Sequence, residues 1–202
     1  MTLQVPRNGA ATVPVRTIAA MAALALLSAC APLEIREGIT VAARAAAPAF
    51  LLEGRISATD GRQAANGGVA WQHTALTDHL TLFSPLGQII ARLESSADSA
   101  TLTRADGTQH TAPDANALLP ELLGIELPVA RLASWVQGAP GAFAEVRAHD
   151  AAGRPLLVID QGWRIDYPGY ADEGPQALPA RIDISRGETR LRLVIDYWTL
   201  PQ

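Results

Sequence analysis

Cys30 is the residue of this 202-residue chain whose chemistry its neighbours specify most closely. It closes the run Leu27-Ser28-Ala29-Cys30, an aliphatic residue and two small residues before a cysteine, which is the pattern of a bacterial lipobox. Arginines and an apolar stretch over residues 18–27 precede it. That stretch is long enough for a signal-peptide core and too short to span a bilayer as a stable helix. Residues 1–29 are therefore predicted to be a lipoprotein signal peptide that is removed.

Lipidation is the use of the Cys30 thiol that the sequence favours over a plain secretory signal with an incidental cysteine. The chain holds no second cysteine, which excludes an internal disulfide and a multi-cysteine metal site. We expect diacylglycerol on the thiol, an acyl chain on the freed amine, and no other cofactor. The next residue is Ala31 rather than the aspartate that usually retains lipoproteins in the inner membrane of enterobacteria. The predicted location is therefore the periplasmic face of the outer membrane, with a lipid anchor.

Charge and composition exclude several classes of function. All 16 basic residues are arginine, and two of them, Arg7 and Arg16, precede Cys30, whereas the 20 carboxylates all follow it. A net negative chain without a basic cluster is a poor match for phosphate backbones, so nucleic acid is excluded as a partner. The absence of lysine excludes Schiff-base chemistry, a Walker lysine and a Ser-Lys dyad.

The chain shows no recognisable catalytic or metal-binding motif. Its four histidines fall in separate predicted elements, without the spacing that places two ligands on one helix face. There is no Gly-x-Ser-x-Gly elbow. We therefore predict no metal, no catalytic residue and no enzyme activity, while active-site pairs distant in sequence remain open.

Two segments are predicted after the signal peptide. Residues 30–48 form a lipidated N-terminus and a first helix over residues 33–47, which Pro48 ends, and residues 49–202 form one domain. From residue 50 the apolar residues alternate with polar ones, which indicates strands. Strands are predicted at residues 50–58, 69–73, 80–82, 89–93, 100–104, 108–111, 143–148, 156–159, 163–167, 181–185 and 190–198. The last strand is expected to turn Leu191, Leu193, Ile195 and Tyr197 to the interior.

A helical pair interrupts these strands. Asp114 is expected to cap a helix that carries Leu118, Leu119, Leu122 and Leu123, that Pro120 kinks or splits, and that Gly124 ends. A second helix is predicted over residues 129–137. The tight turn at Asp106-Gly107 makes its strands antiparallel. One long antiparallel sheet must curl or close, and the helices then cover a volume whose filling, packed or hollow, the periodicity leaves open.

With these elements in place, the mature chain resembles the LolB family of outer-membrane lipoprotein receptors. The matching stretches, in family order, are residues 50–56 (FLLEGRI), 71–73 (WQH), 84–88 (SPLGQ), 112–115 (APDA), 123–124 with 127–128, 132–138 (LASWVQG) with Pro140, 161–165 (QGWRI) with Tyr167 and Tyr170, 178–179, and 191–198. The resemblance implies a mainly β fold, a curled, incompletely closed antiparallel barrel with a helical lid over an apolar cavity.

The resemblance also implies a function. Such a receptor takes lipoproteins from the periplasmic carrier LolA and inserts them into the inner leaflet of the outer membrane without ATP. Expected partners are LolA, acylated lipoprotein cargo and outer-membrane phospholipid, and the chain is expected to be a monomer.

Site residues follow from the same resemblance. Pro85, Leu86 and Gly87 match the protruding loop whose leucine engages the membrane during release. Candidates for the acyl-chain cavity are Phe50, Leu52, Ile56, Trp71, Leu80, Leu82, Leu118, Leu122, Leu132, Trp135 and Trp163. Two other functions remain open: a scaffolding envelope lipoprotein with a packed β core that binds another envelope protein, and a lipid or lipopeptide hydrolase with an unrecognised site.

Overall fold

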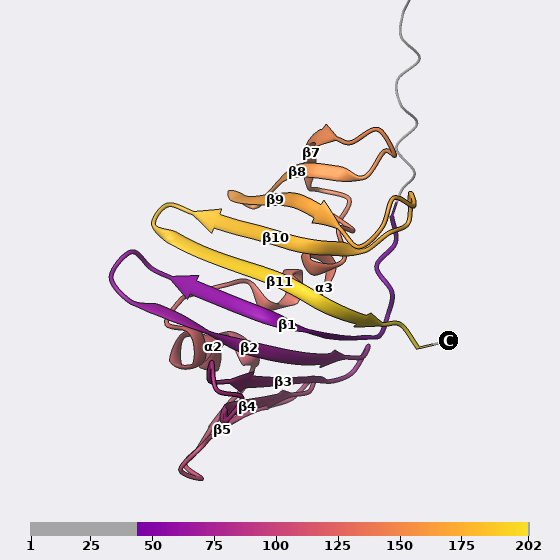
Figure 1. Cartoon of the computed structure of the whole chain (residues 1–202). Coiled ribbons are helices and arrows are strands. Elements are labelled where there is room, and N and C mark those ends of the chain that lie inside the picture. Colours follow the sequence, from indigo (N-terminus) through magenta and orange to yellow (C-terminus); the bar gives the residue numbers. More distant parts are fainter. Residues whose placement is uncertain (1–43, 202) are drawn as a thin grey trace, which may run out of the picture. The chain divides into compact units, whose positions relative to one another are not determined.

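The computed structural model describes residues 44–201, which build one long antiparallel sheet and two helices (Figure 1). The strands are β1 (Phe50–Thr59), β2 (Ala64–His73), β3 (Asp78–Phe83), β4 (Ile89–Ser95), β5 (Ala100–Arg104), β6 (Gln109–Ala112), β7 (Glu145–His149), β8 (Pro155–Asp160), β9 (Trp163–Tyr170), β10 (Pro179–Arg186) and β11 (Thr189–Thr199). The helices are α2 (Ala115–Leu123) and α3 (Val129–Val136).

The sheet is a meander that is joined at its centre by its first and last strands. Its 11 strands lie in the order β6-β5-β4-β3-β2-β1-β11-β10-β9-β8-β7, and each pairs antiparallel with its neighbours. Strands β6 and β7 are the two edges, although they are consecutive in the chain. The segment between them must therefore pass from one edge to the other, and it carries α2 and α3 across the inner face of the curled sheet (Figure 1). The predicted mainly β, incompletely closed barrel with a helical lid is confirmed.

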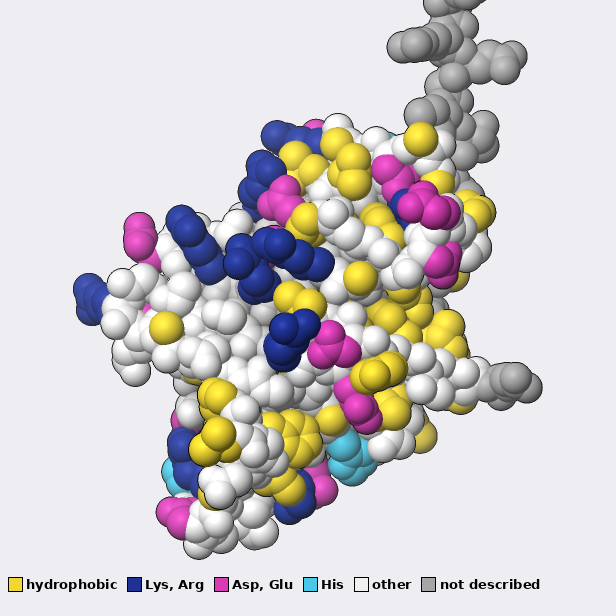
Figure 2. All heavy atoms as spheres, in the orientation of Figure 1, with side chains coloured by type: hydrophobic (Ala, Val, Ile, Leu, Met, Phe, Trp, Pro, Cys, Tyr) yellow, Lys and Arg dark blue, Asp and Glu magenta, His cyan; other side chains and the backbone are white. Residues whose placement is uncertain are grey.

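Alternation along the strands separates an apolar inner face from a polar outer face. In β11, for example, Leu191, Leu193 and Ile195 are buried, while Arg190 before them and Arg192 between them are exposed. The outer face over β9, β10 and β11 carries arginines that are paired with carboxylates, among them Arg164 with Asp166 at 2.6 Å and Arg181 with Asp183 at 3.1 Å (Figure 2). This face is solvated, and the hydrophobic core lies under the helices.

A β-bulge corrects the predicted orientation of the last strand. The register between β1 and β11 shifts between Glu53 and Gly54, because Glu53 pairs with Tyr197 while Gly54 pairs with Ile195. The extra residue reverses the alternation beyond Ile195. Tyr197 is consequently exposed, and Trp198 instead packs against Phe50 with ring centroids 5.4 Å apart.

Both predicted helices are present; α2 has the predicted ends, and α3 ends at Val136, one residue before the predicted end. The Asp114 carboxylate accepts a hydrogen bond from the Ala117 N–H at 3.2 Å, and Gly124 ends α2 with φ of 71°. Pro120 lies inside α2. It contributes no N–H to the helix, so the middle of α2 lacks one backbone hydrogen bond. Neither helix in the described part of the chain is long and apolar enough to cross a membrane.

Three predictions concern segments at or beyond the ends of these elements. Residues 44–47, the end of the predicted first helix, are not helical in the structure, and the remainder of that helix lies outside the described residues. The predicted signal peptide and Cys30 also lie outside the described residues. Phe143 precedes β7 rather than belonging to it, because Gly141 and Ala144 form a turn there. The domain boundaries stay predictions.

Candidate functional site

A small apolar cavity of about 50 Å³ lies between the centre of the sheet and the helices. The sheet contributes leucines and other apolar side chains from β1, β2, β3, β4 and β11, and the helices cover them from the other side. Its lining consists of Leu52, Ile56, Val69, Trp71, Asp78, Leu80, Leu93, Ala115, Leu119, Leu123, Val129, Leu132, Val136, Leu191 and Leu193. Asp78 is the one charged residue among them.

The structure gathers some of the predicted cavity residues and leaves others outside. The predicted residues that line the cavity are Leu52, Ile56, Trp71, Leu80 and Leu132. Phe50, Leu82, Leu118, Trp135 and Trp163 are buried elsewhere in the core, and Leu122 is half-buried. On α2, Leu119 and Leu123 face the cavity. The predicted residues, Leu118 and Leu122, each precede one of them by one position. The period-two pattern of β4 and β11 could have indicated Leu93, Leu191 and Leu193.

Asp78 is a lining residue that the sequence motifs did not single out. One of its carboxylate oxygens accepts a hydrogen bond from Trp71 Nε1 at 2.8 Å and lies 2.7 Å from His73 Nδ1. These partners occupy the carboxylate, so it does not stand free in the cavity. Trp71 therefore presents its apolar ring to the cavity while its only N–H is satisfied at the end of the strand.

Helix α3 is fastened to the sheet by buried polar contacts. The indole N–H of Trp135, which is fully buried, donates to Asp160 Oδ2 at 2.9 Å. The hydroxyl of Tyr167 donates to the Trp135 carbonyl oxygen at 2.9 Å, and burial raises the pKa of Tyr167 far above its usual range, so the hydroxyl keeps its proton. The Trp135 and Trp163 rings also pack together, with centroids 6.1 Å apart. Helix α3 is thus held against β8 and β9 by two buried hydrogen bonds and by aromatic packing.

The end of α3 is also bound to the segment before β1. The side chain of Gln137 accepts a hydrogen bond from the Ala47 N–H at 2.7 Å and donates one to the Ala47 carbonyl at 3.3 Å. Gln137 itself is buried. If α3 moved away, several polar groups that remain buried would lose their hydrogen-bond partners. Each such loss costs about 1–3 kcal/mol.

Helix α2, in contrast, is held to the sheet by apolar contacts and one exposed group of charges. It packs on β4, β5 and β6. The Glu121 carboxylate lies 2.7 Å from His110 Nδ1 and 3.5 Å from Arg104 Nη2, and all three side chains are well exposed to solvent. Exposed ion pairs contribute little, about 0.2–1 kcal/mol each. Pro120 also leaves α2 one backbone hydrogen bond short, whereas the polar contacts that hold α3 are buried.

The loop between β3 and β4 holds Leu86 at an exposed tip. The Ser84 N–H donates to the Gln88 carbonyl at 2.7 Å, and Ser84 Oγ accepts from the N–H groups of Leu86 and Gln88 at 3.3 and 3.2 Å. Gly87 has φ of 82°, which a residue with a side chain rarely adopts. These bonds stiffen the loop, and the Leu86 side chain is left 89% exposed.

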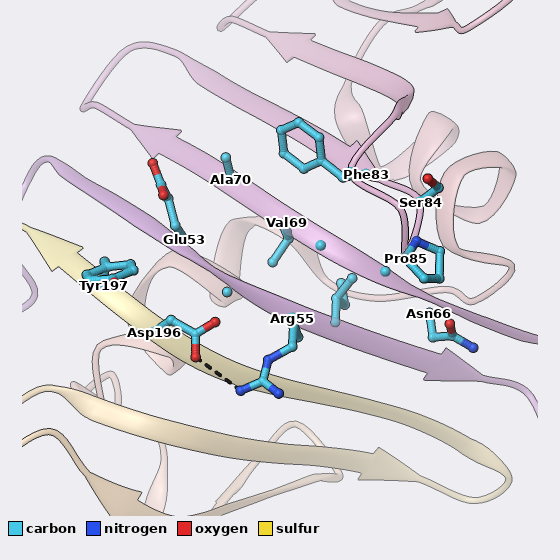
Figure 3. A pocket seen from close by; sticks show the side chains of 15 residues that line it. Glu53, Arg55, Asn66, Val69, Ala70, Phe83, Ser84, Pro85, Asp196 and Tyr197 are labelled. Atoms are coloured by element: carbon cyan, nitrogen blue, oxygen red, sulfur yellow. Dashed lines mark hydrogen bonds and ion pairs between the residues drawn. The ribbon is translucent and has the colours of Figure 1, made fainter.

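A larger hollow, of about 650 Å³, lies on the outer face beside this loop (Figure 3). Figure 3 shows Arg55 and Asp196, paired at 3.1 Å, on one side and Phe83, Ser84 and Pro85 on the other. Glycines of β1 and β2 form its floor, and a Cβ at Gly67 would collide with the Phe83 carbonyl oxygen. The hollow is open to water, and three of its lining residues, Glu53, Arg55 and Asp196, are charged, so it does not enclose an acyl chain as an interior cavity does.

The fold and the cavity define a class of protein, namely a half-barrel that encloses apolar groups under a helical lid. Comparison with known families then gives a narrower result. A family model described as outer membrane lipoprotein LolB matches residues 48–198. The chain belongs to this family, and the resemblance seen in its motifs is confirmed.

Individual relatives agree with the family match. A protein of Azoarcus sp. (strain BH72) is 51% identical, and the aligned region covers 93% of this chain and 97% of the relative. One from Dechloromonas aromatica (strain RCB) is 37% identical over 74% of this chain and 80% of the relative. Both bear the name outer-membrane lipoprotein LolB.

Proposed function

We propose that this chain is a lipid-anchored receptor on the periplasmic face of the outer membrane, which accepts lipoproteins from the carrier LolA and inserts them into the inner leaflet. The observation that carries the proposal is the apolar cavity beneath a weakly held helix, in a domain that also exposes Leu86 on a stiff loop. A packed scaffold needs neither feature. Membership of the outer membrane lipoprotein LolB family supports the same function.

The energetics of acyl chains require an enclosed transfer. At about 0.8 kcal/mol per buried methylene, three chains of ordinary length hold on the order of 30 kcal/mol against water. Release into the periplasm is therefore negligible, and the chains must pass from one apolar enclosure to the next. We propose that the transfer is driven by differences in affinity alone, without ATP, a cofactor or a covalent step on the protein.

The cavity must open to take cargo. Ligand pockets usually measure about 300–1,000 Å³, whereas this cavity measures about 50 Å³. We propose that α2 swings away while α3 stays in place, because the polar contacts of α2 are exposed and those of α3 are buried. The leucines that α2 uncovers are then covered again by the acyl chains. The exchange replaces one apolar contact with another, which keeps the cost of opening low.

Glu121→Gln should loosen the lid. Removing the charge weakens the pairs with His110 and Arg104, so the open form gains about 0.5 kcal/mol and uptake of a hydrophobic fluorophore speeds up roughly twofold. Stopped-flow fluorescence measures this rate. Glu126→Gln is the matched control, because Glu126 is also exposed and lies just beyond α2. Equal rates in the two variants would show that Glu121 does not hold the lid.

Cys30→Ala should release the protein from the membrane without unfolding it. The cysteine precedes the domain and no other cysteine exists for it to bridge, so circular dichroism should be unchanged. Fractionation is the decisive measurement, with the unaltered protein as the control. A variant that still sediments with outer membranes after a carbonate wash would contradict lipidation at Cys30.

The function itself is tested by transfer from a loaded carrier. The mature chain with Cys30→Ala is incubated without ATP with LolA that carries a labelled lipoprotein, and the label is followed by gel filtration. We expect it to move to this chain in a one-to-one complex. No transfer and no displacement of a bound fluorophore by lipopeptide would favour the scaffold, whereas release of fatty acid from an ester substrate would identify a hydrolase.

A further inference from the structure

We propose that Phe143 is a second membrane-contacting residue, which inserts into the same leaflet as Leu86 and fixes the orientation of the domain during delivery. This inference deepens the proposed function and rests on it. The side chain of Phe143 is 92% exposed, more than any other large hydrophobic residue in the described part of the chain, and that of Leu86 follows at 89%. The two lie in different loops and belong to different sequence motifs.

The strand register places both residues at one end of the sheet. Glu145, the first residue of β7, pairs with Ile159. Successive pairings continue this row through β8, β9, β10 and β11 to Thr59, the last residue of β1. Strand β3 runs in the same direction as β1 and ends at Phe83. Phe143 therefore precedes the sheet at the end where Leu86 follows it.

The surroundings of Phe143 suit a lipid surface. No residue from Leu132 to Ala144 is charged, and none is charged from Phe83 to Ala91 around Leu86. The charged residues nearest to Phe143 in the chain are Arg131 and Glu145, and the Glu145 carboxylate is paired with Arg147 at 2.9 Å. Three of the other four hairpins at the same end of the sheet carry charges: Asp60 and Arg62 between β1 and β2, Asp106 between β5 and β6, and Glu188 between β10 and β11. The turn Gln161-Gly162 between β8 and β9 carries none. Leu86 and Phe143 are therefore exposed apolar side chains in uncharged loops, next to charged turns. At a membrane surface the apolar side chains can enter the lipid tails while the charged turns stay among the headgroups.

The chain holds Phe143 outward rather than leaving it free to fold inward. The Ala144 N–H donates to the Gly141 carbonyl at 2.9 Å, which closes a turn around Phe143, and Ala144 packs against the core. At the start of the segment, the Gly138 N–H donates to the carbonyl of Trp135 at 3.0 Å, in the helix that is fastened by buried contacts. Phe143 thus projects from the segment between α3 and β7, whereas Leu86 projects from the loop between β3 and β4.

Two inserted side chains restrict the orientation of the domain on the membrane more than one does. A single inserted leucine lets the domain pivot about its loop, while two inserted side chains define an axis.

The lipid anchor permits this orientation, although β1 begins at the opposite end of the sheet. The segment from Cys30 to Phe50 reaches at most about 70 Å, and the 10 residues of β1 span about 33 Å.

Site-specific labelling tests the proposal. The mature chain with Cys30→Ala has no cysteine, so Phe143→Cys, Leu86→Cys and Leu76→Cys each offer one thiol for an environment-sensitive NBD label. Leu76 is the matched control, because it is 77% exposed in the turn between β2 and β3, at the other end of the strands. With vesicles of phosphatidylethanolamine and phosphatidylglycerol, the fluorescence should rise at positions 143 and 86 and stay constant at 76.

The outcomes separate this proposal from the proposed function. A response at 86 but not at 143 overturns the role of Phe143 and leaves the function intact, whereas no response at either position contradicts membrane contact as a whole. In a second arm, Phe143→Glu should accept cargo normally and deposit roughly tenfold less into the vesicles, while Phe143→Leu should retain most deposition. Loss of acceptance from the carrier, together with normal deposition of cargo that is loaded onto the variant directly, would make Phe143 a carrier contact instead.

Discussion

Leu86→Glu is expected to accept labelled lipoprotein from the carrier at the normal rate and then fail to deliver it. Acceptance depends on the cavity, and Leu86 is not part of its lining. Delivery requires the domain to touch the leaflet, where burial of a leucine contributes about 2 kcal/mol and a glutamate opposes insertion. Deposition into liposomes should therefore fall at least about tenfold while a stable complex with cargo accumulates. Gel filtration and liposome flotation measure the two steps separately.

The structure supplies the controls for this variant. Leu86 is exposed and the loop is held by Ser84, so the melting temperature should not change. Leu76→Glu introduces the same charge at a comparably exposed leucine at the other end of the strands and should deliver cargo normally. If Leu86→Glu delivered as well as Leu76→Glu, the loop would have no part in release. If it unfolded, Leu86 would belong to the core.

Leu132→Glu should reduce cargo acceptance at least about tenfold, because it places a carboxylate in the lining of the cavity on the side that stays fixed. Leu132→Met keeps the volume and the apolar character, so it should cost under about 1.5 kcal/mol and leave acceptance nearly unchanged. Binding of labelled lipoprotein and the thermal transition are measured on the same samples.

A destabilised core without a functional cavity would give a different result. Leu102 is fully buried in β5 and does not line the cavity, and Leu102→Ala should cost about 2–5 kcal/mol. We expect it to lower the melting temperature and still accept cargo at temperatures where it is folded. Loss of acceptance in both variants in proportion to their loss of stability would mean that the interior is simply packed.

Several features of this protein were determined by the sequence alone, because they depend on residues close together in the chain. The alternation of apolar and polar residues indicated the strands, since side chains on a strand point to opposite faces in turn. Asp114 and Gly124 marked the ends of α2, because a cap acts on N–H or C=O groups within one turn. The turn at Pro85-Leu86-Gly87 could be predicted for the same reason, whereas the exposure of Leu86 was implied by the resemblance to the family.

Other features were decided only by the tertiary structure. Leu118, Leu119, Leu122 and Leu123 include two stripes at helical spacing, and either could face the cavity until α2 docks on β4, β5 and β6. Trp135 was predicted in the cavity lining, but its N–H is satisfied by Asp160, which is 25 residues away in the chain. The bulge near Asp196 turned Tyr197 outward and Trp198 inward.

The placement of Phe143 and Leu86 at one end of the sheet belongs to this second group. It follows from the pairing of β1 with β11 and from the paired residues that connect β7 through the neighbouring strands to β11. Residues that are paired across strands but far apart in the sequence produce no local periodic pattern. Their contact depends on the packing of the whole sheet rather than on neighbouring residues in the chain. The local pattern of the chain thus indicated which elements form and predicted Cys30 as the residue to be lipidated, whereas only the tertiary structure decided which side chains share the cavity and which share the exposed end.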